Sequence, residues 1–174
     1  MREKPDKINA YFEEIQNFDQ LWLKLLVFLT PVMLVLINIV LAMKESISIL
    51  NFKDALIDYR MILTIAGISA LSYLVLRLIK LETIIDKNGL HVRFFPAQRK
   101  YRTYTKSEIA EFYKREYNSL TEYGGWGIRY SLKDKSTAYN TSGNIGIQII
   151  TNSGKKVLIG TKNAEMFLQA LNRL

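Results

Sequence analysis

LETIIDKNGLHVRFF, residues 81–95, carries alternating apolar and polar residues on both sides of the turn signal DKNG. This alternation around an Asn-Gly turn predicts a β-hairpin with strands at 81–86 and 90–95. The run 109–117 could be a helical turn, but its aromatic content favours a strand. With this run taken as a strand, six further strands are expected, at 102–105, 109–117, 126–131, 136–140, 145–151 and 156–161. The chain then ends in an amphipathic helix, NAEMFLQALNRL, with Asn163 as its expected N-cap.

Two long apolar runs precede the strands. Residues 25–43 contain no charge over 19 positions, and residues 61–79 are interrupted only by Arg77. Because roughly 20 apolar helical residues cross a bilayer, we predict a transmembrane hairpin over 21–80, with spans at about 21–43 and 60–79.

Small side chains cluster within the second run. Such residues let membrane helices approach closely, so Ala66, Gly67 and Ala70 are the expected helix–helix contact. The segment 1–20 places apolar residues at helical spacing, which predicts an amphipathic helix at the membrane interface. The remaining segment, 81–174, is the expected second domain.

The positive charge of the chain lies in its second part. The net charge is +8; residues 1–79 carry eight basic and eight acidic residues, and residues 80–174 carry sixteen and eight. Basic residues gather directly after the second apolar run, which by the positive-inside rule predicts that both termini are cytoplasmic. The expected location is therefore the cytoplasmic (inner) membrane, with the basic segment facing the lipids of its inner leaflet.

Four segments of the second part resemble one known group of domains: LETIIDKNGLHVRF, YGGWGIRY, AYNTSGNIGIQI and KKVLIGTKNAEMFLQAL. With these segments, residues 81–174 resemble the bacterial pleckstrin-homology-like (PH-like) domains that follow paired membrane helices. The resemblance implies an α+β membrane protein, in which a PH-like antiparallel β-barrel or sandwich of about seven strands is capped by a C-terminal helix. It implies no known ligand.

The glycine-rich stretch YGGWGIRYS, residues 123–131, has two interpretations. A phosphate-binding loop would need a following helix, whereas another turn and strand follow here. We therefore expect Gly124 and Gly125 to form a turn or bulge, and Gly127 to allow close packing at the start of a strand. Arg129 is either a solvated or tyrosine-stacked arginine, or a contact for an anion or partner.

A run of basic residues interleaved with aromatic ones follows the first hairpin. It consists of Arg93, Arg99, Lys100, Arg102 and Lys106. Three interpretations remain open: simple seating on the inner leaflet, specific recognition of a lipid or protein, and nucleic-acid binding, the one we disfavour.

Little in the sequence indicates catalysis. The chain has no cysteine, and its single histidine, His91, has neither a paired histidine nor an obvious carboxylate partner. We predict no catalytic residue, no metal site and no cofactor. The expected function is that of a non-catalytic protein-interaction or scaffolding module at the inner leaflet, with a protein partner or homo-oligomer. The alternatives are an anionic-lipid headgroup sensor and an accessory subunit of a larger membrane complex.

Overall fold

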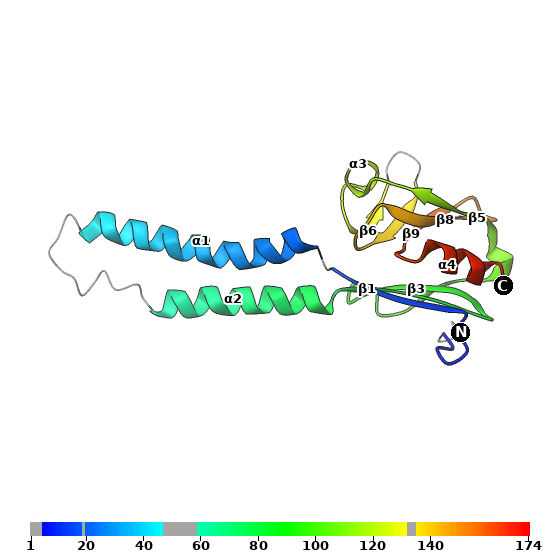
Figure 1. The fold of residues 1–174 in the computed structure, drawn as a ribbon, viewed down its shortest axis with the longest axis horizontal. Helices are drawn as coiled ribbons and strands as arrows, with labels where there is room; N and C mark the ends of the chain where they lie inside the picture. The colour runs from blue at the N-terminus through cyan, green and yellow to red at the C-terminus, as the bar shows by residue number, and fades with distance from the viewer. Residues whose placement is uncertain (1–4, 19, 47–58, 132–134) are drawn as a thin grey trace. The chain divides into compact units, whose positions relative to one another are not determined.

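The computed structural model describes residues 5–18, 20–46, 59–131 and 135–174. Within them the chain forms two compact units, one made of Met1–Phe18 with Leu78–Leu174 and the other of Asp19–Arg77. The first unit contains the strands, and the second is a helical hairpin inserted into it (Figure 1).

The first sheet is antiparallel and has four strands in the order β1-β2-β3-β4. Its strands are β1 (Phe12–Asn17), β2 (Lys80–Asp86), β3 (Gly89–Phe95) and β4 (Arg102–Tyr104). Asn17 pairs with Lys80 at the end of the β1–β2 ladder. The hairpin therefore leaves and rejoins the sheet between two neighbouring strands.

The second sheet has five strands in the order β5-β8-β9-β7-β6. Its strands are β5 (Ile109–Glu116), β6 (Gly127–Tyr130), β7 (Thr137–Asn140), β8 (Ile145–Thr151) and β9 (Lys156–Gly160). β7 and β9 run parallel, and the other pairs are antiparallel. The short helix η1 (Lys106–Glu108) precedes β5, and α3 (Ser119–Tyr123) follows it.

The main core lies between the two sheets. The C-terminal helix α4 (Ala164–Leu171) contacts β1, β5 and β8, and Figure 1 shows it between the two sheets. Phe167 of α4 is fully buried and stacks on Phe12 of β1, with their ring centroids 5.1 Å apart. Apolar residues alternate with outward-facing ones along the strands, so that each sheet offers one side to this core.

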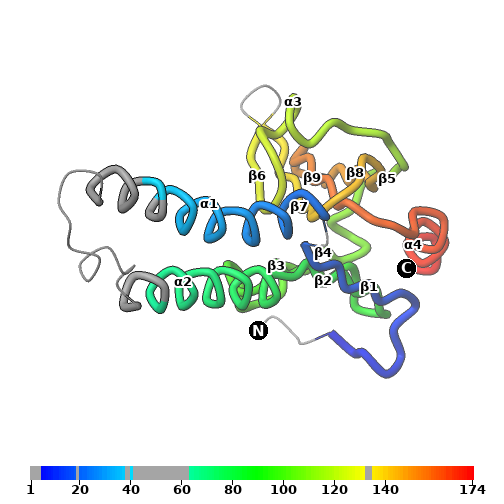
Figure 2. Tube along the Cα trace, turned by 60° about the vertical axis from the view of Figure 1, so that its left-hand side comes forward, coloured from blue at the N-terminus to red at the C-terminus, as the bar shows by residue number. Residues whose placement is uncertain are grey.

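The hairpin consists of α1 (Leu21–Ser46) and α2 (Tyr59–Leu78), which run side by side in both views (Figures 1 and 2). Side chains of intermediate exposure recur every three or four residues along each helix, as expected for two helices that pack along one line. They are Leu23, Val27, Pro31 and Val35 on α1, and Ile65, Ser69, Ser72 and Leu76 on α2. Phe28 and Tyr73 add a tilted ring contact, with centroids 6.5 Å apart.

The prediction of a transmembrane hairpin is wrong, although both helices form where the apolar runs lie. Among the residues that the structure describes, no helix combines the length and the apolar content needed to cross a membrane. The expected multi-pass location in the inner membrane is contradicted by the same finding.

The prediction that the antiparallel barrel or sandwich has about seven strands is also wrong. The described residues form nine strands in two sheets, and the β7–β9 pair is parallel. One added strand comes from the N-terminal segment, which the sequence analysis had placed outside the domain. The resemblance to PH-like domains stays a prediction that this structure does not test.

Residues 12–17 form a strand instead of part of the expected amphipathic helix. Phe12, Glu14 and Gln16 face inward, and the residues between them are exposed. Two of the three inward-facing residues are polar, so the two-residue period is hidden from a search for apolar residues. By contrast, each strand predicted after residue 80 is confirmed to within one residue at either end.

Replacing Gly146 by alanine should destabilise the two-sheet unit by about 1–3 kcal/mol, because the core has no room for a further methyl group. A Cβ at Gly146 would lie 2.9 Å from the Ile159 carbonyl oxygen and 3.2 Å from Tyr117 Cε1. Urea unfolding of the full chain, followed through tyrosine fluorescence, measures the change.

Gly67→Ala is the matched control for this substitution. Its Cβ meets nothing within 4 Å, and alanine favours a helix over glycine by roughly 0.5–1 kcal/mol. Equal stability of Gly146→Ala and the unmodified chain would contradict the packing described above.

Candidate functional site

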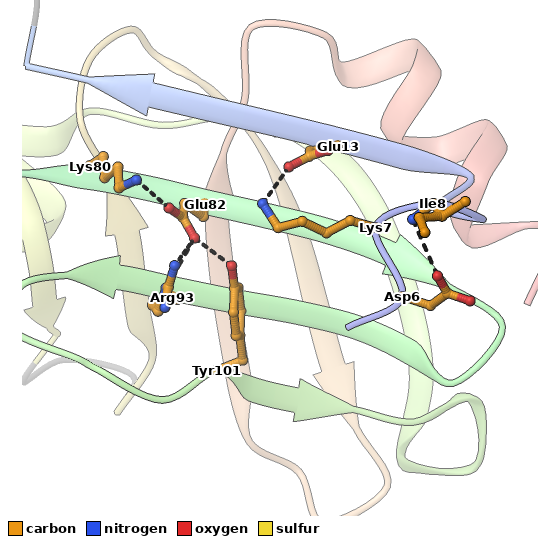
Figure 3. A network of polar contacts seen from close by, with 8 residues as sticks. All are labelled: Asp6, Lys7, Ile8, Glu13, Lys80, Glu82, Arg93 and Tyr101. Atoms are coloured by element: carbon orange, nitrogen blue, oxygen red, sulfur yellow. Dashed lines mark hydrogen bonds and ion pairs between the residues drawn. The ribbon is translucent and has the colours of Figure 1, made fainter. Parts of the chain in front are cut away.

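Glu82 is the centre of a buried polar cluster on the outer side of the first sheet. Lys80 Nζ lies 2.7 Å from Glu82 Oε1, and Arg93 Nε donates to Oε2 at 3.0 Å. Arg93 Nη2 and the Tyr101 hydroxyl also donate to Oε2, and Figure 3 shows the three side chains converging on this carboxylate. The Arg93 guanidinium lies over the Tyr101 ring, 4.3 Å from its centroid.

This arrangement holds Glu82 in its charged form. Burial alone would raise the pKa of its carboxyl, but the donors on Lys80, Tyr101 and Arg93 outweigh burial and lower the pKa from 4.5 to about 2. Burial and the hydrogen bond to Glu82 raise the pKa of the Tyr101 hydroxyl. All groups of the cluster are thus engaged with one another, which is the arrangement of a structural ion-pair network.

Glu82→Gln should lower the free energy of unfolding by about 1–3 kcal/mol at neutral pH, because it removes the charge that three donors share. The folded-state pKa lies below the ordinary value, so the contribution is present above pH ~4.5 and is lost as the pH falls towards 2. Chemical unfolding of both chains between pH 2 and 7 should show their difference shrink over this window.

Glu165→Gln provides the control for this pH series. Glu165 pairs with Lys114 at 2.7 Å, but its side chain is 72% exposed, so its loss should change stability by less than about 1 kcal/mol. A pH-independent difference between the unmodified chain and Glu82→Gln would contradict the role assigned to the charge.

A second cluster joins the first sheet to the second through β1. Glu14 accepts a hydrogen bond from the Thr161 hydroxyl at 2.6 Å and from the Lys162 backbone N–H at 2.9 Å. Gln16 donates to the Gly160 carbonyl at 2.8 Å and accepts from the Thr141 hydroxyl at 3.0 Å. Both side chains are buried, so these bonds fix β1 against the end of β9 and the turn after β7.

His91 has a carboxylate partner that the sequence analysis missed. Its Nε2 lies 3.0 Å from Asp86 Oδ1 and its Nδ1 lies 2.9 Å from the Thr103 hydroxyl, and both His91 and Asp86 are fully buried. The hairpin register could have revealed the pair: His91 is opposite Ile84, which places it diagonally across from Asp86 on the same side of the sheet.

Asp86 also fastens the N-terminal segment to the sheet. Its Oδ2 accepts from the Asp6 backbone N–H at 2.6 Å and its Oδ1 accepts from the Asn88 backbone N–H at 2.8 Å. Burial would raise the pKa of Asp86, but the donors of Asp6, His91 and Asn88 lower it. One carboxylate therefore holds three parts of the chain: the N-terminal arm, the β2–β3 turn and β3.

Asp86→Ala should destabilise the two-sheet unit by about 2–4 kcal/mol, because it leaves buried donors without an acceptor. Amide hydrogen exchange at Asp6 and Asn88 should become faster. Asp6→Ala is the control, since it keeps the backbone donor of residue 6 and removes only the exposed contacts to Ile8 and Asn9. Unchanged exchange at Asp6 in the Asp86→Ala chain would refute the anchoring role of this carboxylate.

The predicted basic run does not form one surface. Arg93 is bound to Glu82, and Arg102 lies opposite Val92 on the inward side of β4, with its guanidinium 5.6 Å from the centroid of the Tyr104 ring. Arg99, Lys100 and Lys106 are exposed. The sequence analysis grouped the five by proximity in the chain, whereas cross-strand pairing sends Arg93 and Arg102 to opposite sides of the sheet.

The glycine-rich stretch begins a strand, as predicted, but it follows a short helix. Asn118 caps α3 by accepting from the Leu120 and Thr121 backbone N–H groups at 3.0 and 3.1 Å. Gly124 ends this helix in the left-handed region with φ 69°. Arg129 is exposed, and its Nε donates to the Trp126 carbonyl at 2.8 Å.

The predicted helix–helix contact is not made by the small residues. Ala66, Gly67 and Ala70 are all exposed, and nothing lies within 4 Å of a Cβ built at Gly67. The less exposed line of α2 runs instead through Ile65, Ser69, Ser72 and Leu76. The packing line within the hairpin therefore follows a neighbouring face of α2, and a helix–helix contact through the small residues stays a prediction.

Comparison with protein-family models, curated proteins and solved structures found no match. Within the described ranges, no group of three or more His, Asp or Glu side chains is placed to hold a metal ion.

The described part of the hairpin carries an exposed apolar surface. Its large apolar side chains have exposed fractions of 38 to 71%. They are Leu21, Trp22, Leu25, Leu26, Phe28, Leu29, Val32, Met33, Leu34, Leu36, Ile37 and Val40 on α1, and Leu63, Ile68, Leu71, Tyr73, Leu74, Val75 and Leu78 on α2. Folded monomers seldom expose a contiguous apolar surface of this kind, which typically marks an interaction site.

Proposed function

We propose that this chain is a non-catalytic protein-interaction module, whose helical hairpin docks among apolar helices of a larger partner protein. The observation that carries the proposal is the exposed apolar surface of α1 and α2. Removing such side chains from water is favourable by roughly 25 cal/mol for each Å² covered, so a matching apolar partner would bind this surface strongly.

The distribution of these side chains favours a partner with several helices. Leu26 and Phe28 are both exposed, although two residues along a helix differ in direction by about 200°. A helix that is apolar on all sides is typical of one surrounded by other elements. A single partner helix would leave part of the surface in water, whereas a helical bundle covers it.

In this proposal the two-sheet unit is the structural scaffold that carries the hairpin. Its buried carboxylates at Glu14, Glu82 and Asp86 all accept hydrogen bonds from the same unit, and these bonds account for their burial. Such groups stabilise the fold without requiring a substrate to explain them. In the chain, the hairpin lies between β1 and β2, two strands that are hydrogen-bonded to each other.

Site-specific photo-crosslinking in the cells that naturally make the protein tests this proposal. A photo-reactive amino acid replaces Leu26 in one chain, Phe28 in another and the exposed Lys156 of β9 in a control. We expect the two helix positions to yield one adduct of the same added mass and Lys156 to yield none.

A competition experiment shows whether the adduct depends on binding through the apolar surface of the hairpin. Co-expressed, unlabelled chain should suppress the adduct, whereas a chain with Leu25, Leu29 and Leu36 changed to glutamine should not, since glutamine preserves helix propensity and removes apolar area. Equal competition by both chains, or adducts formed only with further copies of the same chain, would refute the proposal.

A further inference from the structure

The edge strand β5 of the second sheet offers an interaction surface independent of the hairpin. β5 has eight residues and lies at the end of the strand order, so only β8 pairs with it. Five of its residues are exposed: Ala110, Glu111, Tyr113, Lys114 and Glu116. A long exposed edge presents unpaired backbone donors and acceptors to another strand.

The other edge strands are less suitable. β4 has three residues and β6 has four, which are short for stable pairing. β1 has six residues, but Gln16 binds it to the last residue of β9 and Glu14 binds it to the segment that follows β9. β5 is thus the longest open edge among the described strands.

Charged residues on an edge often prevent pairing, so their arrangement on β5 decides the argument. Glu111, Tyr113 and Arg115 alternate along the strand and share one side of the sheet. In an antiparallel pair of two β5 strands centred on Tyr113, Glu111 of each copy lies opposite Arg115 of the other. The charges are therefore complementary in self-pairing.

The local structure of β5 is compatible with this register. The bulge lies at one end, between Ile109 and Glu111, and leaves residues 111–116 in regular pairing with β8. Arg115 also binds Glu122 of its own chain, but the five N–H donors of a guanidinium suffice for two carboxylates. Tyr113, 40% exposed, would meet Tyr113 of the second copy at the symmetry axis.

We propose that two copies of this chain associate through antiparallel pairing of their β5 strands, which joins the two five-stranded sheets into one continuous sheet. The occupant of the edge is a second copy because the Glu111–Arg115 arrangement is complementary to itself. This proposal does not depend on the function assigned to the hairpin.

Cysteine crosslinking of the full chain tests the register, since the natural sequence has no cysteine. At the axis, the Cβ atoms of residue 113 would lie about 5 Å apart, close enough for a disulfide. Residue 111 of one copy would lie about 14 Å from residue 111 of the other, because four residues separate them along the strand. We therefore expect Tyr113→Cys to form a disulfide-linked dimer at least about tenfold faster than Glu111→Cys or Lys156→Cys.

Mixing two different chains makes the test specific. Glu111→Cys and Arg115→Cys should each crosslink poorly alone, and their mixture should form a mixed disulfide at a rate near that of Tyr113→Cys. Crosslinking of Tyr113→Cys no faster than Lys156→Cys, or equal self-crosslinking of all three edge variants, would overturn the proposal. Repeating the series with Leu25, Leu29 and Leu36 as glutamine should leave these rates unchanged, which separates this edge from association through the hairpin.

Discussion

The pairing of β1 with β2 is the constraint on which the rest of the structure depends. β1 adds the fourth strand to the first sheet, and its inward side chains reach the second sheet through Glu14 and Gln16. A buried carboxylate is costly to leave unpaired, so Glu14 binds firmly where the Thr161 hydroxyl and the Lys162 N–H meet it. Phe12 adds an apolar contact to α4. β1 therefore contacts three parts of the fold: β2, the segment that follows β9, and α4.

The same pairing explains how a two-sheet unit whose buried carboxylates at Glu14, Glu82 and Asp86 are hydrogen-bonded can carry a hairpin with an exposed apolar surface. The hairpin is an insertion between two strands that are already hydrogen-bonded to each other, and Asn17 pairs with Lys80 where it begins. The two-sheet unit has its own apolar core. The exposed apolar residues of the helices are the basis of the proposed docking role.

Sequence periodicity predicted most strands because turns rich in glycine and asparagine separate alternating segments from residue 81 onward. It failed where the inward side chains are polar. Glu14 and Gln16 hide the apolar alternation of β1, so a helix was predicted there instead of a strand. It failed also for the transmembrane prediction, since no described helix meets the requirement for a membrane span. The basic run was misread because neighbouring positions in a strand point to opposite sides.

Partners from other strands decide what each charged residue can do. Arg93 and Arg102 belong to the same basic run, yet Arg93 is neutralised by Glu82 and Arg102 lies beside Tyr104 on the inward side. Asp86 and His91 look unrelated in sequence, yet the β2–β3 register makes them a buried pair. These buried charges are engaged within the fold, so the two proposed recognition surfaces are the exposed apolar side chains of the hairpin and the edge strand β5. The two proposals differ in what is recognised: apolar area in the first, backbone hydrogen bonds and paired charges in the second.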